Sequence, residues 1–105
     1  TEQVNKSEIR VSGSLENHYA PRAHLLLDVA ANSGDGFIAL SDVPTPEGAI
    51  RLAQPRTIES YAQELYGALR EADVKGLSRI VAISPQGTGL AVAIRDRLMR
   101  ASSKS

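Results

Sequence analysis

The second half of the sequence alternates between strand and helix patterns, and this alternation constrains the fold more than any other feature. Residues 49–54, AIRLAQ, and 79–84, RIVAIS, are short apolar runs typical of buried strands. Between them, Thr57 can cap a helix and Gly76 can end it. Apolar residues at spacings of three and four predict one buried stripe on this helix: Ile58, Tyr61 or Ala62, Leu65, Leu69 and Ala72.

A second helix is expected after the fourth strand. The turn PQGTG at 85–89 precedes it, and Thr88 is placed to act as its N-cap. The apolar stripe of this helix is predicted to contain Leu90, Ala93, Ile94, Leu98 and Ala101. Strand, helix, strand and helix in this order favour a parallel sheet covered by helices. The predicted fold class is therefore α/β and Rossmann-like, with a mostly parallel sheet flanked by helices.

The first half is less regular. Residues 24–29 and 37–40 are predicted strands, and the turn NSGDG at 32–36 lies between them. About seven connecting residues are too few for the usual crossover between parallel neighbours. Either the two strands are not adjacent, or they form a hairpin that turns at Asp35-Gly36. We expect a single domain over residues 24–105 and an interdomain linker over 1–23, whose polar start resembles the middle of a longer protein.

Composition excludes several classes of protein. The 105 residues carry 12 basic and 12 acidic side chains, and this neutral balance disfavours direct contact with tRNA. The absence of cysteine excludes disulfides and thiolate metal sites. His18 and His24 lack convergent carboxylates, so no metal site is predicted. No apolar run approaches the ~20 residues that span a bilayer, so we expect no membrane association.

The turn Gly87-Thr88-Gly89 is a candidate phosphate site. It follows a strand and opens a helix, where backbone N–H groups can surround a phosphate. A dinucleotide fingerprint requires a third glycine where this chain has Val92, and its acidic partner would lie beyond Ser105. The alternative interpretation is an ordinary turn between a strand and a helix.

Three arginines are spaced along the last predicted helix: Arg95, Arg97 and Arg100. Basic residues near a helix C-terminus interact favourably with the helix dipole, so a solvated face is the simpler interpretation. Contact with tRNA or a phosphate is the alternative.

The motif HYAP at 18–21 places two polar aromatic residues in the linker. Pro21 disfavours a helical Ala20, so the segment is predicted to be extended. Fixing four backbone residues costs about 4–8 kcal/mol, whereas burying the ring of Tyr19 returns about 1.5–3 kcal/mol. A second surface is therefore needed to hold the segment, which favours a role in lining a ligand site. The alternative is a tether whose Tyr19 packs beside the domain.

Three separated motifs carry a family resemblance that runs from Val11 to Ser102. They are SGSLENHYAPRA at 12–23, YAQELYGALREAD at 61–73 and GTGLAVAIRDRLMRAS at 87–102. In this order they resemble the C-terminal domain of two-domain threonylcarbamoyl-AMP synthases. Those enzymes join a YrdC-like catalytic domain to a small Rossmann-like domain through a linker that carries His-Tyr-Ala-Pro.

The resemblance implies an accessory domain of a cytoplasmic enzyme. The parent protein would make L-threonylcarbamoyladenylate from threonine, bicarbonate and ATP, with Mg²⁺, for tRNA threonylcarbamoyladenosine modification. His18, Tyr19, Ala20 and Pro21 would form the gate across the catalytic pocket. The implied partners are the catalytic domain of the same protein and the downstream threonylcarbamoyl transferase machinery, and this domain itself would bind no cofactor.

The chain lacks the family's catalytic signature, Lys-x-Arg followed by Ser-x-Asn. We therefore predict no catalytic residue in this chain and no activity from it alone. Two other functions are left open: a small nucleotide-binding sensor that uses Gly87-Thr88-Gly89, and a module that docks tRNA or protein through Arg95, Arg97 and Arg100.

Overall fold

The structure is a computed structural model that describes residues 21–103. It contains the strands and helices that the sequence predicts. Each strand ends one or two residues earlier than predicted, and the second also begins one residue earlier, at Gly36. In chain order they are β1 (His24–Leu27), β2 (Gly36–Ile38), β3 (Ile50–Ala53), α2 (Ile58–Val74), β4 (Arg79–Ala82) and α3 (Leu90–Ser103).

The four described strands form one parallel sheet in the order β1-β4-β2-β3. This arrangement confirms the α/β, Rossmann-like fold class. Because β4 lies between β1 and β2, these two strands are not adjacent and no hairpin forms at Asp35-Gly36. The first of the two alternatives for this region is therefore correct.

Short strands explain how the brief connection 28–35 joins two parallel strands. A four-residue strand is only about 13 Å long, and two strand spacings add about 10 Å sideways. The chain must therefore return across about 16 Å, which eight residues with a reach of about 26 Å can span. The usual dozen-residue crossover is unnecessary when the strands are this short.

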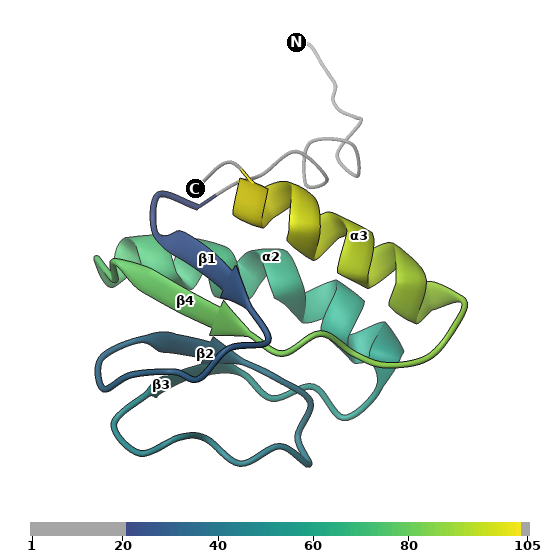
Figure 1. Cartoon of the computed structure of the whole chain (residues 1–105), viewed down its shortest axis with the longest axis horizontal. Helices are drawn as coiled ribbons and strands as arrows, with labels where there is room; N and C mark the ends of the chain where they lie inside the picture. The colour runs from purple at the N-terminus through teal and green to yellow at the C-terminus, as the bar shows by residue number, and fades with distance from the viewer. Residues whose placement is uncertain (1–20, 104–105) are drawn as a thin grey trace, which may run out of the picture.

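Both helices cover the same face of the sheet (Figure 1). The helix α2 packs on β2 and β3, whereas α3 packs on β1 and on α2. The main core lies between this face and the helices. Its largest fully buried side chains include Leu25, Ile38, Tyr61, Leu65, Leu69, Ile80, Ile94 and Leu98.

Within residues 21–103, the opposite face is covered by connecting segments and not by helices. Phe37, Ala39 and Val81 form a second buried cluster there, with Ala31 of the β1–β2 connection and Val43 of the β2–β3 connection packed against it. Right-handed crossovers that run in opposite directions across a sheet lie on opposite faces. The β3–α2–β4 crossover runs opposite to the other two, which accounts for this separation.

The first predicted helix is confirmed in its cap, stripe and end. The Thr57 hydroxyl accepts a hydrogen bond from the backbone N–H of Ser60 at 3.0 Å. The predicted stripe is buried at Tyr61, Leu65, Leu69 and Ala72. Gly76, just beyond α2, adopts a left-handed conformation with φ 72°, as expected for a helix stop.

The second helix differs from its prediction. It begins at Leu90, so that Gly89 and not Thr88 occupies the position before its first residue. Ile94, Leu98 and Ala101 are buried as predicted, but Leu90 and Ala93 are exposed and Ala91 is buried in their place. The stripe was wrong over the first turn, because spacings of three and four admit either residue before Ile94, and Ala91 and not Leu90 continues the stripe of Ile94, Leu98 and Ala101.

Candidate functional sites at the two ends of the sheet

The strand order creates a topological switch point between β2 and β4. The chain leaves β2 toward β3 on one side, and it leaves β4 toward α3, which packs over β1 on the other. Two connections that separate in this way leave a crevice outside the carboxyl ends of the strands, and ligands of open α/β sheets bind in such crevices.

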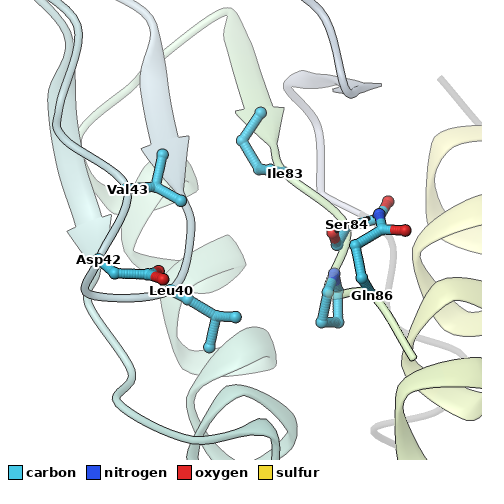
Figure 2. Close-up of a pocket in the computed structure, with 7 residues that line it drawn as sticks. Leu40, Asp42, Val43, Ile83, Ser84 and Gln86 are labelled. Carbon is cyan, nitrogen blue, oxygen red and sulfur yellow. Dashed lines mark hydrogen bonds between the residues drawn. The ribbon is translucent and has the colours of Figure 1, made fainter. Parts of the chain in front are cut away.

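A pocket of about 330 Å³ lies at this switch point (Figure 2). One wall follows β2 and the other follows β4, and Figure 2 shows the two walls on opposite sides of an open space, with the carboxyl group of Asp42 extending into it. We call it the switch-point pocket. It is lined by Leu40, Asp42, Val43, Ile83, Ser84, Pro85 and Gln86.

Arg51 of β3 holds the wall that follows β2. Its two terminal nitrogens donate to the carbonyl oxygens of Ala39, Leu40 and Val43 at 2.8–2.9 Å and to the Thr45 hydroxyl at 2.8 Å. Its Nε donates to its own strand, at the carbonyl oxygen of Ala53. These five contacts use all five N–H donors of the guanidinium.

The charge of Arg51 is stabilised by the neighbouring Phe37 and by carbonyl dipoles. The guanidinium carbon lies 5.2 Å from the centroid of the Phe37 ring, within the range of a cation–π interaction. Partial burial lowers the pKa of Arg51, but a guanidinium stays protonated at neutral pH. With every donor occupied, Arg51 positions the pocket wall and has no N–H left for a ligand.

Asp28 holds the second wall from the end of β1. Its carboxylate accepts from the backbone N–H of Ser84 at 2.8 Å and from the Ser84 hydroxyl at 2.9 Å. Asp28 is also the one non-glycine residue with a positive φ, 57°, among the residues that the structure describes. A strained backbone persists where the surroundings over-determine it, and here the two bonds to Ser84 do so.

Tyr61 of α2 supports the same wall through a hydrogen bond. Its hydroxyl donates to the carbonyl oxygen of Ile83 at 2.9 Å, and its ring is fully buried. Burial raises the pKa of Tyr61 well above its ordinary value, and the negative charge of Asp28 raises it further. Tyr61 is therefore a neutral hydrogen-bond donor at any pH at which the domain functions.

The predicted phosphate turn lies beside this pocket without lining it. Gly87, Thr88 and Gly89 are exposed, and both glycines have a positive φ, 115° and 66°. Arg95 donates to the carbonyl oxygens of Pro85 and Gly87 at 2.8 and 2.9 Å. Arg95 therefore fixes the turn, and the interpretation of a freely solvated side chain was wrong for this residue. Phosphate binding by the turn stays a prediction.

The other two predicted surface arginines behave differently from Arg95. Arg100 pairs with Asp96 at 2.9 Å across one turn of α3, and both side chains are more than half exposed. Exposed pairs of this kind contribute little stability. The exposed Arg100–Asp96 pair agrees with a solvated helix face. Arg97, on the same helix, is half-buried.

The chain enters the domain at the opposite, amino end of the sheet. Pro21 and Ala23 are buried there, and the backbone N–H of Arg22 donates to the Asp73 carboxylate at 3.0 Å. The guanidinium of Arg22 reaches the carbonyl oxygen of the same residue at 3.3 Å. Of the four predicted gate residues only Pro21 is described, since His18, Tyr19 and Ala20 lie outside the described residues. Their role stays a prediction.

An ion pair closes the same end of the sheet. Asp35, which precedes β2, and Arg79, which begins β4, approach to 3.1 Å through Nη2 and through Nε. Asp35 is buried, and it also accepts from the backbone N–H of Asn32 at 2.8 Å.

Residues 21–103 contain neither a cluster that could hold a metal ion nor a helix long and apolar enough to cross a membrane. His24 is exposed at the start of β1, without the acidic neighbours that a metal site requires. The predicted candidates therefore reduce to the turn at 87–89 and the linker at 18–21.

The residues that build the switch-point pocket were missed by the sequence analysis. Asp42 and Gln86 belong to two loops whose proximity depends on β4 inserting between β1 and β2. The available signal was an acidic residue after one predicted strand and a Ser-Pro after another. It becomes informative only when the strand order is known, and the sequence left that order open.

The fold and the pocket together define a small Rossmann-like α/β domain. The family described as "Threonylcarbamoyl-AMP synthase, C-terminal domain" matches residues 1–103. The chain therefore belongs to this family, and the resemblance that its three motifs carry is confirmed. No curated protein and no solved structure shows a significant match to the chain.

Proposed function

We propose that this chain is the accessory domain of a threonylcarbamoyl-AMP synthase and that its segment His18–Pro21 gates the catalytic pocket of a preceding domain in the same protein. The family description supports this proposal, because a C-terminal domain follows another domain in the proteins that carry it. The missing Lys-x-Arg and Ser-x-Asn pair supports it too, since activating bicarbonate against ATP requires fixed positive charge.

The observation that carries the proposal is the anchor that directly follows the gate segment. Pro21 and Ala23 are buried, and Arg22 is held to Asp73 by two hydrogen bonds. The next backbone N–H, that of His24, donates to the carbonyl oxygen of Ser78 at 2.9 Å. A gate needs one fixed end, and these contacts provide it at the carboxyl side of His18–Pro21.

The anchor also lowers the cost of closing the gate. Fixing each backbone residue costs about 1–2 kcal/mol of conformational entropy. Because one end of the segment is already fixed, the open segment has fewer conformations to lose when it closes. In this proposal the C-terminal domain contributes orientation, while the catalytic domain contributes the reacting groups. The downstream transferase machinery and a cytoplasmic location belong to the same proposal.

The first test separates the two domains. The isolated chain is expected to show no threonine-dependent ATP turnover, and joining it to the catalytic domain is expected to restore that turnover. Pyrophosphate release with and without threonine measures this. Detectable turnover by the isolated chain would contradict the division of labour.

The second test loosens the anchor. In the joined protein, Asp73→Ala removes the acceptor for the Arg22 N–H while leaving the backbone carbonyl of residue 73 in place. One lost hydrogen bond is worth about 1 kcal/mol, so we expect a roughly fivefold loss in kcat/KM or in retention of the intermediate. Glu71→Ala is the matched control, because Glu71 is an exposed carboxylate near the same helix end that pairs with Lys75 alone.

Tyr19→Ala in the joined protein tests the gate itself. We expect slower catalysis or faster loss of the intermediate, with little change in melting temperature. Normal kinetics combined with a lower melting temperature would instead show that Tyr19 packs against the domain, and the gating proposal would then be wrong.

A further inference from the structure

We propose that the switch-point pocket binds an uncharged molecule of nucleoside size, which places its apolar ring system between the two walls and donates hydroxyl hydrogen bonds to Asp42. This inference concerns the C-terminal domain alone. It does not depend on the gate segment or on the catalytic reaction of the synthase.

The size and lining of the pocket fit a small organic molecule. A volume of about 330 Å³ lies at the lower end of the range for small-molecule sites. Three of its lining residues are apolar and only partly buried: Leu40, Val43 and Ile83. They belong to both walls, so a flat or compact apolar body can contact side chains on each of its faces (Figure 2).

The polar groups of the pocket favour a hydrogen-bond donor over an anion. Asp42 is an exposed carboxylate that forms no ion pair with residues 21–103, and it extends into the space between the walls. Gln86, on the opposite wall, donates its amide nitrogen to the carbonyl oxygen of Ser84 at 3.4 Å. Neither lysine nor arginine lines the pocket in the described part of the chain. A phosphate placed there would face Asp42 without a compensating cation.

The nearest cations are already committed to the protein. Arg51, directly behind the wall that follows β2, spends all five donors on protein oxygens. Arg95 is bound to the carbonyl oxygens of the turn after β4. Neither guanidinium lines the cavity, and both direct N–H donors to protein carbonyl oxygens.

Both walls are held before any ligand arrives. Arg51 fixes the backbone of residues 39–45, whereas Asp28 and Tyr61 fix residues 83–84. A preformed site avoids the ordering cost that a mobile loop imposes on binding. The left-handed backbone of Asp28 agrees with this interpretation, because strain of that kind concentrates at sites of function.

A nucleoside combines the required groups in one molecule. Its base is flat and mostly apolar, and its ribose carries two adjacent hydroxyl groups. A single carboxylate can accept from both, as the acidic residue of Rossmann domains does for ribose. Asp42 follows β2 at the switch point, where such a carboxylate can reach a ribose while the base lies among the apolar residues.

The experiment titrates the ¹⁵N-labelled chain with adenosine, 2′,3′-dideoxyadenosine and AMP while amide resonances are recorded. We expect adenosine to shift the resonances of Leu40, Val43 and Ile83 with saturation in the low millimolar range. Dideoxyadenosine is expected to bind at least fivefold more weakly, and AMP no more tightly than adenosine. Absence of saturable shifts with adenosine, equal binding of dideoxyadenosine or tighter binding of AMP would overturn the proposal.

Variants locate the site and its key contact. Asp42→Asn is expected to lower the affinity for adenosine at least fivefold and to leave the affinity for dideoxyadenosine unchanged, because only adenosine carries the 2′ and 3′ hydroxyls. Glu47→Gln, an equal charge change in the same exposed loop, is expected to leave both ligands unchanged. Val43→Trp is expected to fill the cavity and abolish binding while the remaining spectrum keeps its dispersion. Adenosine binding that survives Val43→Trp, or an Asp42→Asn loss that is equal for both nucleosides, would also overturn it.

Discussion

The two ends of the parallel sheet hold their carboxylates in opposite ways. At the amino end, Asp35 is paired with the cation Arg79 at 3.1 Å and is almost completely buried. At the carboxyl end, Asp28 is exposed and is held only by the neutral donors of Ser84. The carboxylate at the amino end is neutralised by a cation, whereas Asp28 at the carboxyl end is held by neutral donors beside an open pocket.

The stabilising ion pair and the pocket lie at opposite ends of strands that are at most four residues long. Contacts at the amino end join β2, β4, the C-terminal turn of α2 and the incoming chain. Contacts at the carboxyl end hold loops apart and leave space between them. Substitutions at one end can therefore be made without removing the contacts at the other.

The largest expected effect is on the amino end. Asp35→Ala leaves Arg79 without its carboxylate and the N–H of Asn32 without its acceptor. Breaking a fully buried ion pair costs about 3–5 kcal/mol, and because the Arg79 side chain is 35% exposed we expect a loss of about 3 kcal/mol. Urea unfolding measures this loss. Asp42→Ala, which removes a carboxylate from the other end, is expected to change stability by less than about 0.5 kcal/mol.

A smaller effect is expected from Asp28, where backbone strain and hydrogen bonding can be separated. Asp28→Ala loses both bonds to Ser84 and places a residue that disfavours positive φ in the left-handed region, at a cost of about 2 kcal/mol. Asp28→Gly loses the same bonds without the backbone penalty, and we expect about 1 kcal/mol. Equal losses for the two variants in urea unfolding would show that the positive φ stores no strain.

The helix-covered face of the sheet was predictable from the sequence because local signals agree there. Thr57 begins α2, Gly76 follows its end, and the stripe through Leu65 and Leu69 has the period of a helix that packs on one side. Gly89 precedes the first residue of α3, although Thr88 was expected in that position. A cap assignment depends on turn geometry, which residue preference alone does not determine.

The pocket was not predictable, because its residues come together through strand order. Asp42 and Ser84 are distant in sequence, and they meet only because β4 inserts beside β2. Arg51 looked like the polar residue of an alternating strand, yet its five contacts are with loop and strand oxygens that no local pattern identifies. By contrast, the prediction for the linker motif rests on its residues alone, since Pro21 restricts its neighbour whatever the tertiary structure, and it stays a prediction.

The smallest expected effect is a pH dependence that belongs to the carboxyl end alone. Tyr61 holds its proton in the folded state to a higher pH than in the unfolded chain, where its pKa is about 10. Below that value both states are protonated and stability is unaffected. Above it, the unfolded chain releases the proton while the folded domain retains it, so stability falls by up to about 1.4 kcal/mol per pH unit.

Tyr61→Phe isolates this contribution from the other titrating groups. The variant loses the hydrogen bond to Ile83, at about 1 kcal/mol near pH 8, but it also loses the alkaline dependence of that one side chain. In urea unfolding at pH 9 and pH 11, the free energies of unfolding of the two proteins should therefore be closer at the higher pH. Because the charge of Asp28 contributes to the raised pKa, Asp28→Asn should reduce the same dependence slightly. The free energies of unfolding of Tyr61→Phe and the unmodified chain could instead differ by a constant amount across this range. That result would show that the phenol ionises as readily in the folded domain as in the unfolded chain. The inference that a neutral Tyr61 supports the pocket wall would then be wrong.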